Sequence, residues 1–396
     1  MPAVFGRATR IGITGAGPSG AFAAQHLAEA GFPVTLFDPK GAWEKPCGGG
    51  VTTRALERYD FLLDNPEWPS RRIDRITLVG PSRSRLDLVL DRPFRVYARE
   101  RLNGLLLERA LAAGATLVRE AITRFSRNSS GEWVLGTKSG EHAVDLLVGA
   151  DGAGSIIRRD LAGRFRPEDV ALTVGYNGPV NPADPDPSAV LIEFPADFSG
   201  YIWKFPRTDH VNFGTFNRLN ERPAVELKQR LHAVMADYYR AEPPAADLDF
   251  FGAKVPMLRP ASWPTLVTYG DGWVLVGDAA GFVDPITGEG IYYALRSGEL
   301  LAHTIAGDGS LADYDRAWRD DFGKDLAAAS RYYDRFYRGR FFGAPFVDRA
   351  IQFSRLHGGV RRVMRRALGG EQSYVTLKRD LVLGAAGFGH RSHDRA

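Results

Sequence analysis

The stretch that decides the fold is RIGITGAGPSGAFAAQHLAEAGFPVTLFD, residues 10–38. An apolar run, RIGITGAG, is followed by small residues typical of a helix, by a glycine at position 31 that favours a helix end, and by a second apolar run, PVTLFD. This order predicts a strand, a helix and a second, parallel strand. The fold class is therefore predicted to be α/β, opening on a Rossmann-type unit.

Within this opening, Gly15, Gly17 and Gly20 form G-x-G-x-x-G between the first strand and the helix, and Asp38 ends the second strand. The glycines let backbone N–H groups approach a pyrophosphate at the helix N-terminus, and the carboxylate accepts hydrogen bonds from a ribose. A tight turn without a ligand is the alternative, and the order of strand, helix, strand and acid argues against it. The pattern indicates a dinucleotide but does not separate FAD from NAD.

A second stretch, GDAAGFVDPITGEGIYYALRSG at 277–298, favours FAD. Asp278 follows a buried strand and can accept hydrogen bonds from ribityl hydroxyls, while Gly281, Gly288 and Gly290 let the chain run flat against a ring system. A helix expected to begin around Gly288 would point its positive end at that ring, and a reduced isoalloxazine, anionic at N1, is stabilised by such a dipole. A strand and turn before an ordinary helix remain the alternative.

The rest of the chain predicts an antiparallel-sheet domain inserted into the first one. Proline-rich connections separate strand-like runs between 166 and about 263, with a helix near 223–241, and the chain reads as helical from 310 to near 380. We expect an FAD-binding domain of residues 1–72, 96–165 and 264–330, a substrate domain of 73–95 and 166–263, and a C-terminal helical region of 331–396.

The composition is that of an ordinary globular protein, with 396 residues, 44% hydrophobic and 25% charged residues, and a net charge of +4. One cysteine, Cys47, excludes an internal disulfide framework and a thiolate metal cluster within one chain. No run resembles a signal peptide or reaches membrane-spanning length, so we expect a cytoplasmic protein. No histidine has metal-ligand spacing, and we expect no metal site. The histidines considered are His26, His210, His232, His390 and His393.

Four signatures in order, between residue 11 and about residue 300, resemble a known family. GADGAGSIIR (149–158) and GDAAGFVDPITGEG (277–290) resemble the DG and GD motifs of para-hydroxybenzoate hydroxylase-like flavoproteins, while KPCGGGVTTRAL (45–56) and YIWKFP (201–206) resemble the geranylgeranyl reductase branch. The resemblance implies an FAD-dependent oxidoreductase of isoprenoid lipid metabolism. It would saturate carbon–carbon double bonds of a geranylgeranyl-type chain carried by a diphosphate, a lipid or a quinone, by hydride transfer from reduced flavin.

The resemblance also implies which residues bind the cofactor. Arg99 lies in YARERLNGLL, which resembles the family pattern D-R-x-x-F-D-x-x-L but departs from it at Ala98, Leu102 and Asn103. The implied FAD-binding residues are Gly15, Gly17, Gly20, Asp38, Cys47, Gly48, Gly49, Arg99, Asp151, Gly152, Gly277, Asp278, Pro285, Gly288, Glu289 and Gly290.

By the same resemblance, the C-G-G-G segment lies beside the flavin, with the thiol near the reactive edge of the ring. A free cysteine is more often a small buried hydrophobic residue than a catalyst. The roles of Cys47 as proton donor, redox partner, substrate gate or structural residue therefore stay open. Candidate proton sources are Cys47, Tyr292 and water.

In a strand, Tyr201, Trp203 and Phe205 share one face, and Ile202 and Lys204 take the other. Three aromatic side chains form an apolar wall suited to a long hydrocarbon, although an ordinary domain core has the same spacing. The resemblance to the family motif Y-x-W-x-F-P favours substrate binding. The predicted substrate-binding residues are Tyr201, Trp203, Phe205 and Pro206.

No second dinucleotide motif follows the first, so the electron donor, NADPH or ferredoxin, stays open. The basic and aromatic segment between Arg331 and Arg379 suits a peripheral contact at the inner membrane face better than nucleic acid. The main alternative function is an aromatic monooxygenase using NAD(P)H and oxygen. More distant alternatives are a flavin-dependent halogenase, whose W-x-W-x-I-P element is related to residues 201–206, and a non-catalytic flavin-binding sensor.

Overall fold

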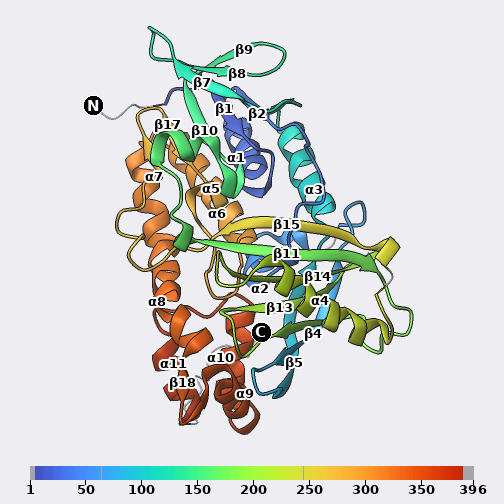
Figure 1. Cartoon of the computed structure of the whole chain (residues 1–396). Helices are drawn as coiled ribbons and strands as arrows, with labels where there is room; N and C mark the ends of the chain where they lie inside the picture. Colours follow the sequence, from blue (N-terminus) through green and yellow to red (C-terminus); the bar gives the residue numbers. More distant parts are fainter. Residues whose placement is uncertain (1–4, 64, 244, 387–396) are drawn as a thin grey trace, which may run out of the picture. The chain divides into compact units, whose positions relative to one another are not determined.

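The computed structural model describes residues 5–63, 65–243 and 245–386 of the chain (Figure 1). These residues form two compact units, each assembled from three separate segments. The first unit runs to Lys45 and also contains residues 98–171 and 254–327. The second unit contains residues 46–97 and 172–253 and the chain from Ala328 onward.

The two units divide the chain differently from the sequence-based boundaries, most extensively at two places. Residues 46–72, assigned above to the FAD-binding domain, fall in the second unit, and so do the helices after Ala328, assigned above to a region of their own. The contacts give the reason. β3 (Gly50–Val51) pairs with β5 (Arg85–Val96), and α9 (Phe346–Leu356) packs against β5 as well. Such pairings between distant segments leave no local mark in the sequence.

The first unit is built on a mostly parallel sheet with the strand order β16-β17-β10-β1-β2-β6. β1 pairs in parallel with β2 on one side and with β10 on the other, which confirms the predicted βαβ opening. β10 pairs in parallel with β17, and only the short edge strand β16 is antiparallel. The strands are β1 (Ile11–Thr14), β2 (Val34–Phe37), β6 (Thr116–Val118), β10 (Leu146–Gly149), β16 (Tyr269–Gly270) and β17 (Trp273–Leu275).

Helix α1 packs against β1 and β2 and against two further helices, α3 and α6. Its fully buried small side chains, among them Ala21, Ala23 and Ala24, allow this close approach on several sides. Because β2, β1, β10 and β17 are parallel neighbours, the segments that follow them meet at one edge of the sheet. The helices of this unit are α1 (Pro18–Glu29), α3 (Arg99–Ala112), α5 (Gly277–Ala280), α6 (Ile291–Ala306) and α7 (Leu311–Trp318).

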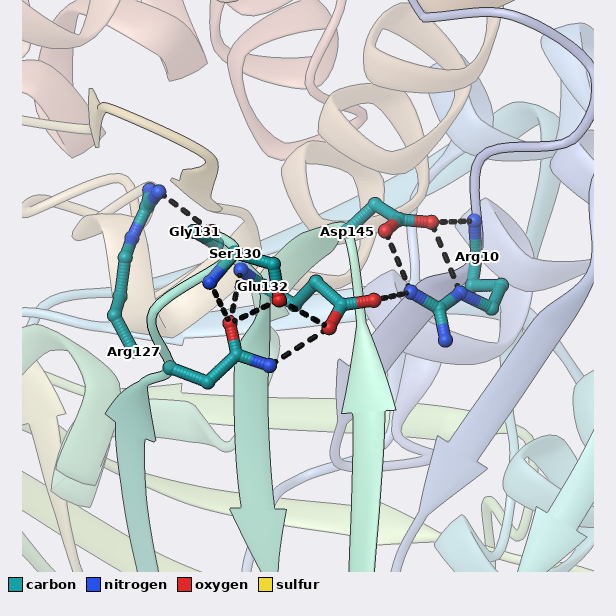
Figure 2. Close-up of polar contacts among 7 residues, drawn as sticks. Arg10, Arg127, Ser130, Gly131, Glu132 and Asp145 are labelled. Carbon is teal, nitrogen blue, oxygen red and sulfur yellow. Dashed lines mark hydrogen bonds and ion pairs between the residues drawn. The ribbon is translucent and has the colours of Figure 1, made fainter.

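A small antiparallel sheet of the same unit is joined to the parallel sheet by charged groups (Figure 2). Arg10 donates from its backbone N–H and from Nε to Oδ2 of Asp145, at 2.7 and 3.1 Å, and also pairs with Glu132. The hydrogen bond from Arg10 holds the pKa of Asp145 below its usual value. The network therefore connects the start of β1 to the strands of this sheet, β7 (Arg124–Arg127), β8 (Trp133–Gly136) and β9 (Glu141–Val144).

The second unit contains a larger sheet with the order β15-β11-β14-β13-β12-β4-β5-β3. It is mostly antiparallel, as predicted, but β12 and β4 pair in parallel. The exception arises because no hairpin joins these two strands, and the chain passes through the first unit between them. The remaining strands are β4 (Arg71–Val79), β11 (Val170–Pro179), β12 (Ala189–Glu193), β13 (Gly200–Pro206), β14 (His210–Arg218) and β15 (Asp249–Pro256).

Both faces of this sheet are covered. α4 (Ala224–Tyr239) buries Leu227, Leu231 and Met235 at helical spacing in a cluster that includes Ile202 of β13. A second cluster joins Ile73 and Val190 of the sheet to Val347 and Ile351 of α9, with Tyr201 and Phe205 packed against it. The core of the second unit therefore lies on two sides of the sheet.

The predicted helices after residue 310 are confirmed, with one interruption. A short hairpin of β18 (Arg340–Phe341) and β19 (Ala344–Pro345) separates α8 from α9. Within residues 5–63, 65–243 and 245–386, no helix is both long enough and apolar enough to cross a bilayer. The other helices of this unit are α2 (Thr53–Arg58), α8 (Lys324–Arg338), α10 (Gly358–Leu368) and α11 (Leu377–Ala385).

Candidate functional site

The turn between β1 and α1 forms a cradle for an anion. Gly15 has φ +91°, and a Cβ on Gly20 would lie 2.0 Å from the carbonyl oxygen of Gly15, so the helix starts directly on this turn. A Cβ on Gly17, by contrast, would meet no described heavy atom within 4 Å. No described side chain caps α1, and its first turn has no acidic residue. The uncapped N–H groups and the open space at Gly17 suit a pyrophosphate.

Asp38, which ends β2, bonds to the same turn. Its Oδ2 accepts a hydrogen bond from the N–H of Ala16 at 2.8 Å, and its Oδ1 accepts from the N–H groups of Lys40 and Gly41 at 2.8 and 2.9 Å. Each carboxylate oxygen has more than one acceptor site. The half-buried carboxylate is therefore fixed in orientation and retains capacity for ribose hydroxyls.

Asp151, which follows β10, is a buried carboxylate with unused capacity. Oδ2 accepts from the N–H of Ile156 at 2.9 Å, whereas Oδ1 is buried without a hydrogen-bond partner among the described residues. Burial raises the pKa of Asp151. A Cβ on the adjacent Gly152 would meet no described atom within 4 Å. A buried acceptor beside open space is an arrangement that a hydroxyl-rich ligand would satisfy.

Arg99 lies in the first turn of α3 and is buried. It contacts Asn103, one of the three residues that depart from the family pattern. One of its Nη atoms lies 3.3 Å from Oδ1 of Asn103, and its Nε has no partner in the described part of the chain. Asn103 also donates to the carbonyl of Trp43 at 3.1 Å. An amide thus occupies the place of the family's acid and orients Arg99 without neutralising its charge.

The segment after β17 contains an ion pair and a sharp turn. Asp278 accepts from Nζ of Lys45 at 3.1 Å. Oδ1 of the buried Asp284 accepts from the N–H groups of Ile286 and Thr287, which shapes the turn around the buried Pro285. Gly288 then adopts φ +70°.

Helix α6 begins at Ile291, three residues later than the predicted start near Gly288. The positive φ of Gly288 is incompatible with a helix at that point, and the helix starts only after Gly290. Oε1 of Glu289 accepts from the N–H of Tyr292 at 2.7 Å, so this carboxylate already uses part of the positive end of the helix. Tyr292 itself is buried in the first turn of the helix.

In the second unit, the cysteine–glycine segment lies against the aromatic strand. A Cβ on Gly48 would stand 2.8 Å from Cδ2 of Phe205 and 3.5 Å from Nε1 of Trp203. Sγ of the half-buried Cys47 accepts from the N–H of Gly49 at 3.3 Å, and the carbonyl of Cys47 accepts from Arg207 at 2.6 Å. The thiol is thus held by a backbone N–H, and the main chain of Cys47 is held by the guanidinium that follows β13.

The aromatic side chains of β13 form a continuous row. Ring centroids of Tyr201 and Trp203 lie 5.8 Å apart, and those of Trp203 and Phe205 lie 6.3 Å apart. The indole Nε1 of Trp203 donates to Oδ1 of Asn212 at 2.7 Å. On the opposite face, Lys204 pairs with Asp184 at 3.0 Å. The predicted separation of the two faces is confirmed.

Sequence reasoning did not find two residues that contact the predicted site. Lys45 pairs with Asp278, and the fully buried Arg207 holds the carbonyl of Cys47. Lys45 is the first residue of the quoted segment 45–56, two residues before Cys47, and Arg207 directly follows Pro206. That adjacency is the only signal in the sequence, because their partners are distant along the chain.

The predicted residues therefore gather in two groups, one in each unit, and their functional roles remain predictions. The described residues contain no group of three or more side chains arranged to hold a metal ion; His390 and His393 lie outside them. In the first unit are Gly15, Gly17, Gly20, Asp38, Arg99, Asp151, Gly152, Gly277, Asp278, Pro285, Gly288, Glu289, Gly290 and Tyr292. In the second unit are Cys47, Gly48, Gly49, Tyr201, Trp203, Phe205 and Pro206.

The chain is similar in sequence to known proteins over most of its length. The family model described as an FAD binding domain matches residues 8–310. Digeranylgeranylglycerophospholipid reductase 2 of Methanothermobacter thermautotrophicus is 31% identical over 346 residues, covering 81% of this chain and 86% of that protein. The chloroplastic geranylgeranyl diphosphate reductase of Oryza sativa subsp. japonica is 29% identical over 363 residues, covering 83% and 73%.

Among solved structures, a geranylgeranyl bacteriochlorophyll reductase-like protein of Thermoplasma acidophilum has a TM-score of 0.74 at 19% identity, covering 95% of this chain and 99% of that one. Flavin-dependent halogenases also have the fold, at an identity that shows the fold alone. The fold and the anion cradle define an FAD-dependent oxidoreductase. Within that class, the chain belongs to the geranylgeranyl reductase family.

Proposed function

We propose that the protein reduces carbon–carbon double bonds of a geranylgeranyl-type isoprenoid chain. The observation that carries the proposal is the packing of Gly48 on Phe205, since it joins the cysteine–glycine segment and the aromatic row into one surface. The relatives named above are reductases of geranylgeranyl diphosphate and of a digeranylgeranyl glycerophospholipid. These relatives favour an isoprenoid chain with an anionic head group as the proposed substrate, with a quinone side chain as the alternative carrier.

The aromatic row is the proposed contact for the hydrocarbon. The rings of Tyr201, Trp203 and Phe205 follow one another along β13, with Trp203 buried and the other two half-buried, and the polar edge of Trp203 is occupied by its bond to Asn212. Saturating an unactivated alkene builds positive charge on one of its carbons. The negative faces of aromatic rings stabilise such charge, which a wall of aliphatic side chains would not do.

FAD, when bound, supplies the hydride. In the first unit, the uncapped N-terminus of α1 would hold the pyrophosphate, and Asp38 would accept from the ribose. Asp151 and Asp278 would accept from the remaining hydroxyls. Lys45 adds a positive charge beside Asp278, which favours anionic groups in its neighbourhood.

The proposed sources of the proton delivered to the second alkene carbon are Cys47, Tyr292 and water. The Sγ of Cys47 accepts from the N–H of Gly49, the carbonyl of Cys47 accepts from Arg207, and the next residue, Gly48, packs on the ring of Phe205. Cys47→Ser retains a proton donor and Cys47→Ala removes it. If the thiol is the donor, Ser retains part of the turnover and Ala loses nearly all, with equal FAD content in both.

The test is anaerobic. The FAD-loaded protein is reduced with dithionite and mixed with geranylgeranyl diphosphate or with a digeranylgeranyl glycerophospholipid, and the flavin absorbance is followed while the lipid is analysed by mass spectrometry. Flavin reoxidation with lipid mass gains of two hydrogens per step supports the reductase. A flavin that stays reduced until oxygen enters, with unchanged lipid, contradicts it and points to the monooxygenase. The electron donor is then identified by replacing dithionite with NADPH or with reduced ferredoxin.

A further inference from the structure

The hairpin between α8 and α9 has a phenylalanine where its own turn does not favour one. Phe341 pairs with Ala344, which leaves Phe342 and Gly343 as a two-residue turn with φ +46° and +76°. Positive φ at both central residues is the signature of a type I′ turn, in which Asn-Gly is preferred. Phe342 is strained at this φ, and its side chain is 74% exposed. Neither the turn, which favours asparagine, nor burial in the core explains why position 342 is a phenylalanine.

Phe342 is part of a larger apolar surface. Its ring centroid lies 4.3 Å from that of Phe341, which lies 6.3 Å from that of Phe353 in α9. Leu356, one helical turn beyond Phe353 on the same side of α9, is 69% exposed. These four residues, Phe341, Phe342, Phe353 and Leu356, are called the Phe342 patch.

The backbone carbonyls at the tip of the hairpin accept hydrogen bonds from arginine side chains, as an apolar environment would require. Arg349 donates to the carbonyls of Phe341 and Phe342, at 3.2 and 2.6 Å, and Arg340 donates to the carbonyl of Gly343. Hydrogen-bonded carbonyls cost less to remove from water than free ones. Neither guanidinium forms an ion pair with a carboxylate in the described part of the chain. Two uncompensated positive charges therefore border the Phe342 patch.

We propose that the Phe342 patch inserts into the interfacial layer of a lipid bilayer that carries anionic headgroups. The exposed aromatic rings match the apolar boundary of the acyl chains, which they would enter. The arginines that border them match the anionic headgroups, because their guanidinium groups would remain at the phosphates. A protein partner with an acidic surface would pair with the arginines but would leave the exposed rings unexplained. The proposal is independent of the reaction proposed above.

The experiment measures binding of the FAD-loaded protein to vesicles by flotation. Vesicles of phosphatidylcholine alone are compared with vesicles that also contain phosphatidylglycerol. The key variant is Phe342→Asn, because asparagine tolerates the left-handed φ of this turn. We expect it to keep or raise the melting temperature and to lower vesicle binding by roughly tenfold. Phe250→Ser, at a 47% exposed phenylalanine of β15, is the matched control and should bind as the wild type does.

Two further measurements separate the apolar and electrostatic contributions. Arg340→Gln should weaken binding to the anionic vesicles and leave the weaker binding to phosphatidylcholine unchanged. Phe342→Trp should show a blue shift of its emission on anionic vesicles, relative to the wild type measured in parallel. The proposal is overturned if the wild type does not float with anionic vesicles, or if Phe342→Asn binds as tightly as the wild type.

Discussion

Gly48 lies so close to the ring of Phe205 that a Cβ on the glycine would stand 2.8 Å from Cδ2 of the ring. Van der Waals contact between two carbon atoms requires about 3.5 Å or more. Position 48 therefore accepts only glycine while the ring keeps its place. The two motifs that suggested an isoprenoid reductase are thus one packed surface, and changing either one displaces the other.

The first prediction concerns this contact. Gly48→Ala should push the ring of Phe205 aside, at a stability cost of about 1 kcal/mol because a side chain can move, and lower turnover by roughly tenfold. Because the resemblance also implies a cofactor contact at Gly48, an unchanged FAD content is the result that attributes the loss of turnover to the displaced ring of Phe205. Turnover and flavin content are measured on one preparation.

The control for Gly48→Ala is Gly358→Ala, where a Cβ would meet no described atom within 4 Å. Gly358→Ala should change neither the turnover nor the flavin content. Equal turnover of Gly48→Ala and wild type would show that the position of Phe205 does not matter to the reaction.

The second prediction separates two glycines of the anion cradle. Gly20→Ala places a methyl group 2.0 Å from a backbone carbonyl that cannot move aside, so it should cost 2 kcal/mol or more, roughly, in the free energy of unfolding. Gly17→Ala meets open space in the cofactor-free protein and should leave the melting temperature of that form unchanged. If the pyrophosphate passes position 17, Gly17→Ala should nevertheless weaken FAD binding by about tenfold or more. Unchanged FAD affinity in Gly17→Ala would place the cofactor elsewhere.

The third prediction is a pH dependence caused by Asp151. Its pKa is raised by burial in the cofactor-free fold, so its contribution to stability is complete below the ordinary carboxyl pKa and is lost as pH rises through the raised value. Asp151→Asn removes the ionisation. The melting temperature of the cofactor-free variant, relative to that of the wild type, should therefore increase as pH rises from acidic toward neutral. The difference between the two should then stay constant.

The same variant should bind FAD about tenfold more weakly, because an amide NH2 replaces one of the two carboxyl oxygens that would accept from the cofactor's hydroxyls. A parallel pH dependence of the two proteins would contradict the burial of this carboxylate. An unchanged FAD affinity would contradict its role in the site. Differential scanning fluorimetry and fluorescence titration with FAD measure the two quantities.

The fourth prediction concerns the Arg10 network of Figure 2. The pKa of Asp145 is lowered by Arg10, so its stabilising effect is present above the ordinary carboxyl pKa and is lost as pH falls through the lowered value. Asp145→Asn should reduce the free energy of unfolding by about 1 kcal/mol near neutral pH, since the pair is partly exposed, and by progressively less below about pH 4. Asp74→Asn removes the more exposed pair with Arg72 and should have almost no effect. Urea unfolding at several pH values measures both.

The parts of the molecule that follow from local sequence were predictable. The β1–α1–β2 opening follows from the spacing of Gly15, Gly17 and Gly20 between two apolar runs, and the two faces of β13 follow from strand alternation. Motifs that follow parallel neighbouring strands meet at one edge, so the grouping of Asp38, Asp151 and Asp278 in one unit is also a consequence of a local pattern.

The features that were not predicted depend on distant segments or on an unusual residue. The contacts of Arg207 and Lys45 could not be predicted, because their partners, Cys47 and Asp278, lie far along the chain. The hairpin at 340–345 was read as helix because its turn contains Phe342 in place of the asparagine that normally marks such a turn. The late start of α6 was missed because Gly288 adopts a positive φ that its sequence context does not show.

The indole of Trp203 lies over Gly214 of the neighbouring strand, where a Cβ would stand 2.1 Å from the ring. The two positions are therefore coupled in size, and a larger residue at 214 requires a smaller one at 203. A homologue that exchanged bulk between them would move the same volume from one strand to the next, about 5 Å away. Under the proposed function, in which the aromatic row contacts the hydrocarbon, such an exchange would shift that contact surface by one strand without changing the segment at 47–50.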